Sequence, residues 1–262
     1  MNFGISGVYL RRFLGMNIII DIGNTRTKLA FFDKNTLSEK AILEVLTLDD
    51  LSERLKGQAV EGVIMSVTGQ NTEGVEKWLR ENYFFIQLHH ETPIPIDNQY
   101  GTPKTLGKDR LAAVVAANFL FPNKNCLVID SGTCITYNFI NKKGQFLGGN
   151  IAPGLTMRLK AMHHFTAKLP QIERNTEGAF SEIIGKNTEQ AMLIGAQMGL
   201  LAEVEGFVKR FEKKFGAFQV ILTGGDGDFL AENSALKNGH YEPNLVFMGL
   251  NQILNYNLNS TE

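Results

Sequence analysis

The stretch that decides the fold reads Asn17-Ile18-Ile19-Ile20-Asp21-Ile22-Gly23-Asn24-Thr25-Arg26-Thr27-Lys28. Ile18 to Ile20 are apolar at consecutive positions, which is typical of a strand buried on both faces. Gly23 and Asn24 then favour a tight hairpin, because both residue types tolerate positive φ. Taken alone, the stretch is equally consistent with an ordinary hairpin that carries a solvated lysine.

The polar residues of this turn are suited to phosphate. Successive backbone N–H groups at such a turn can point at a phosphate group, and Thr25, Thr27 and Lys28 would add side-chain donors. Asp21 lies at the end of the strand and would face the same space. Its carboxylate could hold a metal ion or the waters around one.

The same pattern occurs a second time. The second copy reads Cys126-Leu127-Val128-Ile129-Asp130-Ser131-Gly132-Thr133-Cys134-Ile135-Thr136-Tyr137-Asn138-Phe139-Ile140, which is again a buried strand, Asp-x-Gly-Thr and a further strand. A repeat at this distance predicts two similar halves, each offering a phosphate-facing turn to a shared cleft. A third segment, Val220 to Gly227, places glycines after a short apolar strand, where backbone can approach a ligand closely.

Bulk composition narrows the class of protein. The chain has 262 residues, 44% of them hydrophobic, and a net charge of −1, which is enough for one large or two small domains and gives no electrostatic reason to expect nucleic acid. Cys126 and Cys134 are expected to be small buried residues rather than a disulfide. No apolar run approaches the roughly 18 residues that span a bilayer, and Met1 to Gly15 lacks the order of a signal peptide, so a cytoplasmic protein without membrane contact is expected.

Local patterning predicts an α/β protein. The first half is expected to run β-β-β-α-β-α-β, with strands at 17–22, 29–32, 41–46, 62–67 and 84–88 and helices at 48–55 and 72–82. A helix at 109–121 precedes the repeated hairpin. The rest of the second half is expected to contain strands at 146–150 and 220–223 and helices at 155–165 and 188–215. No element is predicted after residue 227.

The helix predicted at 188–215 carries a stripe of small residues, Ala191, Gly195, Gly199 and Ala202. A glycine inside a helix costs about 1 kcal/mol, which is understandable if another helix packs very close to it. That helix could belong to the same chain or to a second copy of the chain. Spacing alone favours neither, and we take a dimer interface as the working hypothesis.

An irregular stretch with three prolines, Thr92 to Gly107, leads into the helix at 109–121. Loops held by a rigid scaffold are where binding sites are often built. Gly107-Lys108-Asp109-Arg110 lies at the start of the helix, where the macrodipole and the free N–H groups favour an anionic group. The competing interpretation is a helix N-cap and a surface ion pair formed by Asp109 and Arg110.

The duplicated hairpin with a later Gly-Gly segment resembles the superfamily of acetate and sugar kinases, Hsp70 chaperones and actin, and the finer pattern resembles type III pantothenate kinase. The matching segments follow the order of that family: Asp21–Lys28, Gly107–Arg110, Ile129–Thr133, Gly149–Gly154, Gly185–Thr188 and Thr223–Asp226. The resemblance implies an actin-like ATPase fold of two ribonuclease H-like halves, residues 16–118 and 119–262, with the active-site cleft between them. Because Met16 directly precedes the first strand, residues 1–15 are expected to be either a disordered extension or a misassigned start.

The resemblance also implies an activity and a set of site residues. The activity is the ATP-dependent phosphorylation of pantothenate to 4′-phosphopantothenate, the first step of coenzyme A synthesis. By position in the family motifs, the residues that would bind ATP are Asp21, Ile22, Gly23, Asn24, Thr25, Arg26, Thr27, Lys28 and Thr133. The residues that would hold pantothenate are Tyr100, Gly107, Lys108, Asp109, Arg110 and Thr188.

Within that set, the resemblance assigns particular roles. Asp109 would be the general base, and Asp130 would bind the monovalent cation, K⁺ or NH₄⁺. Mg²⁺ or another divalent cation would accompany ATP. Family members are homodimers with the site at the subunit interface, so Thr188 would come from the partner subunit.

This chain departs from the family pattern at two positions. Lys108 replaces a residue that is often small, so its side chain is expected to point outward, and Cys134 replaces an alanine. Two other functions stay open at this point. One is another small-metabolite kinase of the same superfamily, such as a sugar or N-acetylhexosamine kinase, and the other is a non-catalytic regulatory accessory protein derived from the family.

Overall fold

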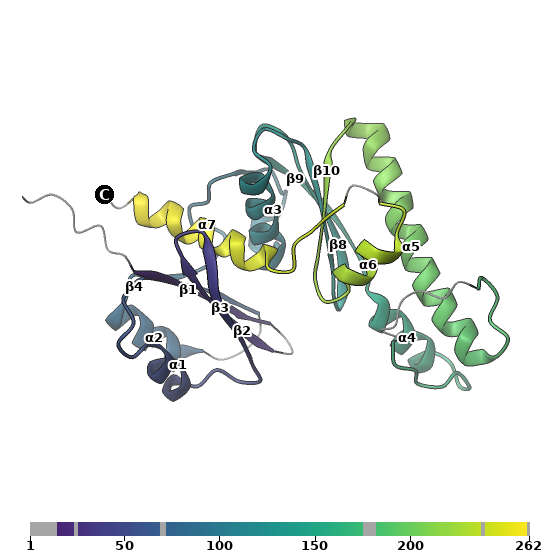
Figure 1. Ribbon diagram of the computed structural model, residues 1–262, viewed down its shortest axis with the longest axis horizontal. Helices are drawn as coiled ribbons and strands as arrows, with labels where there is room; N and C mark the ends of the chain where they lie inside the picture. Colours follow the sequence, from purple (N-terminus) through teal and green to yellow (C-terminus); the bar gives the residue numbers. More distant parts are fainter. Residues whose placement is uncertain (1–14, 24–25, 69–71, 175–181, 237–238, 261–262) are drawn as a thin grey trace, which may run out of the picture. The chain divides into compact units, whose positions relative to one another are not determined.

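The computed structural model describes residues 15–23, 26–68, 72–174, 182–236 and 239–260 (Figure 1). By its internal contacts the chain forms two compact units. The first unit consists of Met1–Leu88 with Asn257–Glu262, and the second of His89–Tyr256.

The first unit is built on a mixed five-stranded sheet. Its strands are β1 (Met16–Ile22), β2 (Thr27–Asp33), β3 (Thr36–Leu43), β4 (Val60–Val67) and β5 (Phe85–Gln87), in the order β3-β2-β1-β4-β5. The first three strands form an antiparallel meander, and β4 and β5 run parallel to β1. The predicted order of elements is therefore confirmed for this half.

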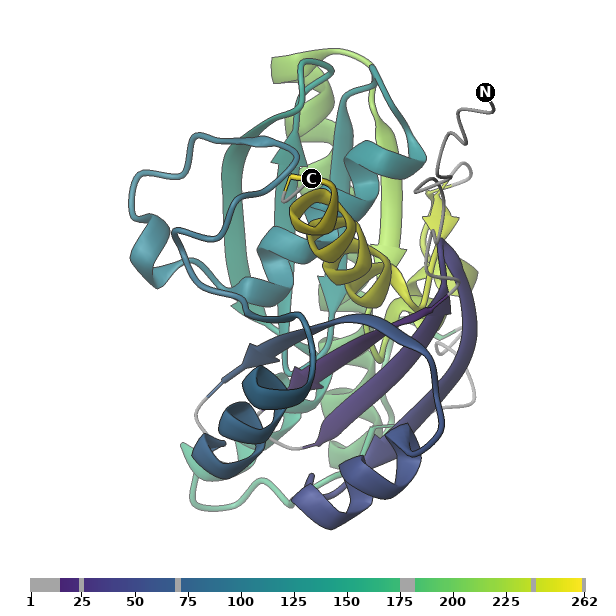
Figure 2. The ribbon, with the colours of Figure 1, turned by 90° about the vertical axis from the view of Figure 1, so that its left-hand side faces the viewer.

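Two helices cover one face of that sheet, as Figure 2 shows with the blue helices against the purple strands. They are α1 (Leu48–Leu55) and α2 (Glu73–Asn82). Thr47 caps α1, because its side chain accepts a hydrogen bond from the Asp50 backbone N–H at 3.1 Å. Leu51 and Leu79 pack with alternate residues of β1, namely Ile18, Ile20 and Ile22, so Asp21 points to the opposite face.

The second unit contains a mixed six-stranded sheet in the order β11-β10-β7-β8-β9-β6. Its strands are β6 (Asp97–Asn98), β7 (Cys126–Ser131), β8 (Cys134–Ile140), β9 (Gln145–Pro153), β10 (Gln219–Thr223) and β11 (His240–Tyr241). β7, β8 and β9 form an antiparallel meander, while β10 is parallel to β7 and β11 is parallel to β10. The order β9-β8-β7-β10-β11 thus repeats β3-β2-β1-β4-β5 with the same directions, which confirms the predicted repeat.

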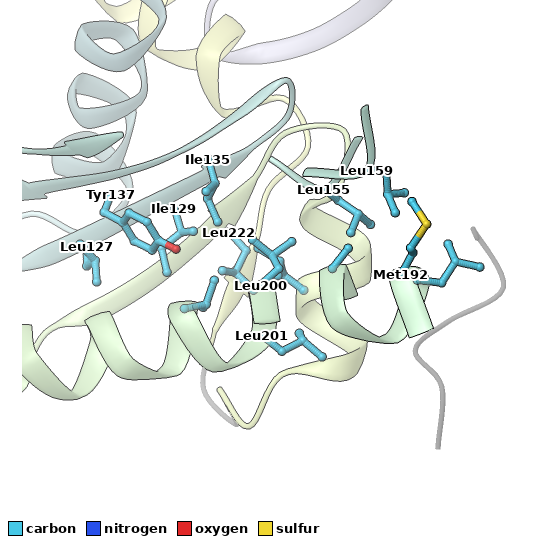
Figure 3. Close-up of a cluster of buried hydrophobic side chains, with 14 of the residues drawn as sticks. Leu127, Ile129, Ile135, Tyr137, Leu155, Leu159, Met192, Leu200, Leu201 and Leu222 are labelled. Atoms are coloured by element: carbon cyan, nitrogen blue, oxygen red, sulfur yellow. The ribbon is translucent and has the colours of Figure 1, made fainter. Parts of the chain in front are cut away.

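Helices lie on both faces of this second sheet (Figure 1). One face carries α4 (Leu155–His164), α5 (Thr188–Phe215) and α6 (Gly227–Asn233), which pack on Leu127, Ile129 and alternate residues of β8 (Figure 3). The other face carries α3 (Lys108–Leu120) and α7 (Leu245–Asn259), preceded by the short 3₁₀ helix η1 (Pro103–Thr105). A Cβ atom on Gly249 would overlap the Ala112 backbone, so α3 and α7 are in close contact.

The helix α3 belongs to one half of the chain by the order of elements and to the other by packing. In the repeated order of elements, α3 ends the first copy just as α7 ends the second. By packing, however, α3 belongs to the second unit, because its apolar residues contact β7 and β8. The division predicted at residue 118 concerns the repeat, and it stays a prediction.

Several sequence expectations need correction. β3 begins at Thr36 and ends at Leu43, earlier than the predicted 41–46, and α6, β11 and α7 had not been predicted. No φ in the left-handed region is found at Gly23, so the hairpin does not use the glycine as expected. Finally, α5 is long and apolar enough to cross a membrane by length and composition, although no apolar run of this length was expected. Eight of its residues are buried, and most of these pack into the core of the second unit.

Candidate functional site

The first Asp-x-Gly turn joins β1 to β2. The backbone N–H of Gly23 donates to the Arg26 carbonyl at 3.1 Å, which closes the turn. Asp21 lies directly opposite Lys28 in the antiparallel register, with Asp21 half-buried and Lys28 exposed. The turn therefore presents an acid and a base side by side at the end of the sheet. Two of the predicted ATP-binding residues, Asn24 and Thr25, lie outside the described residues.

The second turn joins β7 to β8. Here the Gly132 backbone N–H donates to the Cys134 carbonyl at 2.9 Å. Asp130 is half-buried and lies opposite Thr136, while Thr133 is exposed at the tip. The turn offers a carboxylate and hydroxyl groups but no side-chain cation of its own.

Two glycines from other elements close around this second turn. Gly154, the residue before α4, donates its backbone N–H to the Thr133 carbonyl at 3.1 Å, and a Cβ atom there would overlap the Gly132 carbonyl. Gly224, which follows β10, has a φ of +90°, and a Cβ atom there would overlap both Ser131 and the Asp130 carboxylate. Both glycine motifs of the sequence thus converge on the carboxyl end of β7.

Arg110 forms the centre of a second cluster in the same unit. Its side chain is buried, with 5% of the residue exposed, and its Nε donates to Asn138 Oδ1 at 2.7 Å. The guanidinium carbon lies 5.3 Å from the centre of the Tyr100 ring, and that ring stacks on Phe146 at 6.0 Å and 7°. Nη2 is buried without a hydrogen-bond partner, and no carboxylate among the described residues forms an ion pair with this arginine.

Asp109 precedes this arginine and is exposed. α3 begins at Lys108 with Gly107 as its N-cap, and Asp109 Oδ1 accepts a hydrogen bond from the Arg110 backbone N–H at 2.8 Å. The competing interpretation of an N-cap and a surface ion pair is therefore wrong, because Asp109 is not the cap and Arg110 is not on the surface. Lys108 is half-buried rather than fully outward.

Thr188 lies elsewhere in the second unit, at the first position of α5, and is exposed. The N-cap is Asn187, whose side chain accepts a hydrogen bond from the Gln190 backbone N–H at 2.8 Å. The small residues Ala191, Gly195, Gly199 and Ala202 are all exposed on one side of this helix. Within the described part of the chain, no helix packs on Gly195, because a Cβ atom there would meet nothing within 4 Å.

Sequence reasoning missed a network of one ion pair and two hydrogen bonds close to the second turn. Arg158 donates from Nε to the Pro153 carbonyl at 2.9 Å and pairs with Glu203 at 2.5 Å. The same carboxylate accepts a hydrogen bond from the Tyr137 hydroxyl at 2.8 Å. Burial, and then Glu203, raise the pKa of Tyr137 well above its usual value. This network connects α4 and α5 to Pro153, the residue before Gly154.

Asn138 was missed as well, although the sequence contains a signal for it. It lies on β8 between Tyr137 and Phe139 and is fully buried. A buried asparagine in a central strand requires hydrogen-bond partners, so its presence in that run indicates a polar contact inside the fold.

Metal binding was tested on the residues present. No group of three or more His, Cys, Asp or Glu side chains in the described parts of the chain could hold a metal ion. Asp130 is instead a single carboxylate, whose Oδ1 and the neighbouring Ser131 carbonyl both lie close to Gly224, and hard cations prefer oxygen ligands of this kind. This environment fits a cation that keeps other ligands, such as waters or phosphate oxygens.

Comparison with known proteins gives a consistent result. A family model described as type III pantothenate kinase matches residues 17–210. A type III pantothenate kinase from Bacteroides fragilis is 43% identical over 243 residues, which is 92% of this chain and 98% of that protein. One from Phocaeicola vulgatus is 42% identical, with 92% and 99% covered.

Solved structures agree at the level of the fold. A conserved Baf family protein from Campylobacter jejuni superimposes with a TM-score of 0.60 at 24% identity, covering 92% of this chain and 99% of that one. Component A of (R)-2-hydroxyglutaryl-CoA dehydratase from Acidaminococcus fermentans gives 0.51 at 14% identity, with 94% and 98% covered. The predicted α/β fold is confirmed.

Proposed function

The chain belongs to the type III pantothenate kinase family, and from this premise we propose how its own residues carry out the ATP-dependent phosphorylation of pantothenate. The activity is that of the family. The roles of individual residues, the cations and the subunit arrangement are our proposal.

The buried guanidinium of Arg110 carries the proposal. A charge removed from water costs several kcal/mol unless it is paired, and Asn138 supplies only a neutral acceptor. The unsatisfied Nη2 therefore calls for an anionic ligand. Pantothenate has one carboxylate, and arginine binds carboxylates through charge-assisted hydrogen bonds. In this proposal Nη2 binds that carboxylate, and Tyr100, Gly107 and Lys108 line the same site.

Asp109 is the general base of the proposed mechanism. The hydrogen bond from the Arg110 backbone N–H to Oδ1 restrains its carboxylate at the start of α3. Asp109 accepts the proton of the pantothenate 4′-hydroxyl as that oxygen forms its bond to the γ-phosphorus of ATP. The bond from the γ-phosphorus to the β,γ-bridging oxygen breaks, and ADP leaves. Such a base contributes about 10²–10⁴ in rate, and the remainder of phosphoryl transfer depends on positioning.

Both turns bind ATP in this proposal. The phosphate-binding residues of the first turn are Asp21, Ile22, Gly23, Asn24, Thr25, Arg26, Thr27 and Lys28, and that of the second turn is Thr133. Gly23 does not adopt a positive φ. In this proposal a glycine is suited to the position because its missing side chain leaves the backbone N–H groups of the turn accessible to phosphate. The start of α4 beside Thr133 adds a helix N-terminus that favours anions.

Cations complete the nucleotide site. Asp130 binds K⁺ or NH₄⁺, and Mg²⁺ or another divalent cation accompanies ATP. These ions supply neutralisation of the charge on the phosphate oxygens.

The protein acts as a homodimer in this proposal, with the acceptor site completed by Thr188 of the second subunit. Three observations support it. The small-residue stripe of α5 is exposed, close backbone approach is the usual reason for glycine in a helix, and Ile183 and Ile184 are 73% and 71% exposed just before that helix. An apolar region of this kind at one end of α5 is suited to a partner surface.

One assay tests the function. Purified protein with ATP, Mg²⁺, K⁺ and pantothenate should yield 4′-phosphopantothenate, identified by mass spectrometry, and should not phosphorylate a panel of sugars and N-acetylhexosamines. Phosphorylation of a sugar but not of pantothenate would contradict the proposal in favour of the other kinase. ATP binding without any phosphorylation would favour the accessory protein.

A further inference from the structure

The cluster around Arg110, which is the proposed acceptor site, contains a buried polar side chain to which the sequence analysis assigned no role, Asn138 of β8. It is fully buried, and its amide forms two hydrogen bonds. Oδ1 accepts from Arg110 Nε at 2.7 Å, and Nδ2 donates to Thr136 Oγ1 at 2.9 Å. Thr136 in turn lies opposite Asp130 in the sheet. Asn138 therefore connects the arginine of the acceptor site to the carboxyl end of β7.

The chemistry of the partners fixes which way this amide faces. Arginine has donors only, so the carbonyl oxygen of Asn138 must face Nε. The NH₂ group must then face the Thr136 hydroxyl, which accepts from it. A leucine would satisfy neither partner, and an aspartate would accept from the arginine but would neutralise its charge.

Two contacts together determine the direction of the guanidinium. The group is planar, so the hydrogen bond at Nε and the Tyr100 ring at 5.3 Å fix its plane and its rotation. Nη2 is the atom left without a partner. If the bond at Nε were lost, the buried side chain could turn, and Nη2 would no longer point in one direction.

We propose that Asn138 is a positioning residue of the acceptor site, which orients Arg110 so that Nη2 meets the carboxylate of the acceptor. This inference rests on the proposed function, since it names the group that Arg110 binds. Asn138 acts through the arginine and does not touch the substrate. Because the carboxylate is remote from the reacting hydroxyl, the bond to it is the same in the ground state and the transition state. Its loss raises KM and leaves kcat nearly unchanged.

Kinetics of the full-length protein test this role. Asn138→Leu should raise the KM for pantothenate about 10-fold or more, the usual effect of losing a charge-assisted hydrogen bond, while the KM for ATP and kcat change by less than about 3-fold. Asn138→Gln keeps a neutral amide oxygen as an acceptor for Nε and should bring the KM for pantothenate closer to the wild-type value than Asn138→Leu does.

Asn141→Leu is the matched control. Asn141 follows the same strand, and its side chain accepts hydrogen bonds from the Lys143 and Gln145 backbone N–H groups at the far end of the sheet. This variant should lower the melting temperature and leave both KM values unchanged. It thus shows what a purely structural loss looks like in the same assay.

The outcomes separate the two proposals. A folded Asn138→Leu variant whose KM values for pantothenate and ATP rise together, or do not rise, contradicts the positioning role while leaving the kinase function intact. Wild-type protein that does not phosphorylate pantothenate contradicts the proposed function first. If Asn138→Leu does not fold, Thr136→Val removes the other anchor of the amide. An unchanged KM for pantothenate in that variant contradicts the inference.

Discussion

The two Asp-x-Gly turns occupy equivalent positions in the two sheets, yet they are built differently. In the first, four residues separate the paired Ile22 and Thr27, whereas in the second only three separate Ser131 and Ile135. Lys28 lies opposite the aspartate of the first turn, and Thr136 lies opposite that of the second. The first turn therefore carries its own cation, while the second depends on its surroundings.

Those surroundings are the packed glycines of other segments. Gly154 and Gly224 lie so close to the second turn that neither position could hold a side chain. Around the first turn, a Cβ atom on Gly23 would meet only the Arg26 carbonyl, at an ordinary 3.4 Å. The two copies thus share the geometry of their strands, and in the proposed function one turn binds phosphate through side-chain charge and the other through a fixed backbone. Three experiments test this contrast, and another first tests the proposed base, against which the turns can be compared.

The largest effect is expected for a residue that belongs to neither turn. Asp109→Asn should lower kcat by about 10²–10⁴, because the proton of the acceptor hydroxyl loses its base. The melting temperature should stay within about 2 °C of the wild-type value, since the side chain is exposed and the amide oxygen can still accept from the Arg110 N–H. Asp228→Asn, at an exposed position of α6, is the control. Near-normal turnover of Asp109→Asn would remove the base from the mechanism and leave phosphate binding at the turns as the main source of catalysis.

Disturbing the packing of Gly224 against the second turn should have the next largest effect. Gly224→Ala combines a φ of +90° with overlap of Ser131, so we expect a loss of about 3 kcal/mol in the free energy of unfolding and weaker ATP binding. The matched control is Gly225→Ala, whose Cβ would meet nothing within 4 Å. Urea unfolding of both variants measures the difference. Equal stability would mean that the second turn is not held by packing.

The sequence predicts the features that depend on nearby residues and misses those that depend on residues far apart in the chain. The repeat, α1 and the long α5 were predicted, because the spacing of apolar residues is a local property of the chain. The burial of Arg110 was not predicted, because an arginine in the first turn of a helix is expected to be exposed to solvent. In the structure, contacts with β8 and Tyr100 bury it. Asn138 stands out in the sequence as a polar residue in a buried strand, but the sequence does not say which residue it contacts. Its partner is 28 residues away in sequence, and no local pattern records that pairing.

The charge of the first turn can be tested without disturbing its backbone. Lys28→Met should raise the KM for ATP about 10-fold, the usual effect of losing one charge-assisted hydrogen bond, with the stability unchanged because the side chain is exposed. Lys56→Met, after α1 in the same unit, controls for the change in net charge. If both variants bind ATP equally well, the first turn binds phosphate through backbone alone, and the contrast between the two turns disappears.

The smallest effect concerns a buried hydroxyl group that each hairpin contains. Thr27 and Ser131 are fully buried, and no partner for either hydroxyl is found among the described residues. They lie on opposite strands of their hairpins, since Thr27 faces Ile22 across the first and Ser131 faces Ile135 across the second. A buried hydroxyl without a partner costs about 1–3 kcal/mol, so Thr27→Val, which keeps the shape, should stabilise the protein by about 1 kcal/mol.

Ser131→Ala gives the corresponding measurement for the second turn, so that the roles of the two hydroxyl groups can be compared. It removes the hydroxyl next to Asp130 and leaves only a small void, so the apo protein should gain less than about 1 kcal/mol. Thermal unfolding with and without ATP, Mg²⁺ and K⁺ then reports what each hydroxyl does for the nucleotide. A loss of ligand-induced stabilisation in Ser131→Ala alone would mean that the second turn uses a buried hydroxyl where the first uses an exposed lysine. Loss in both variants would show that the hydroxyls serve the same purpose, and the two turns would then differ only in charge.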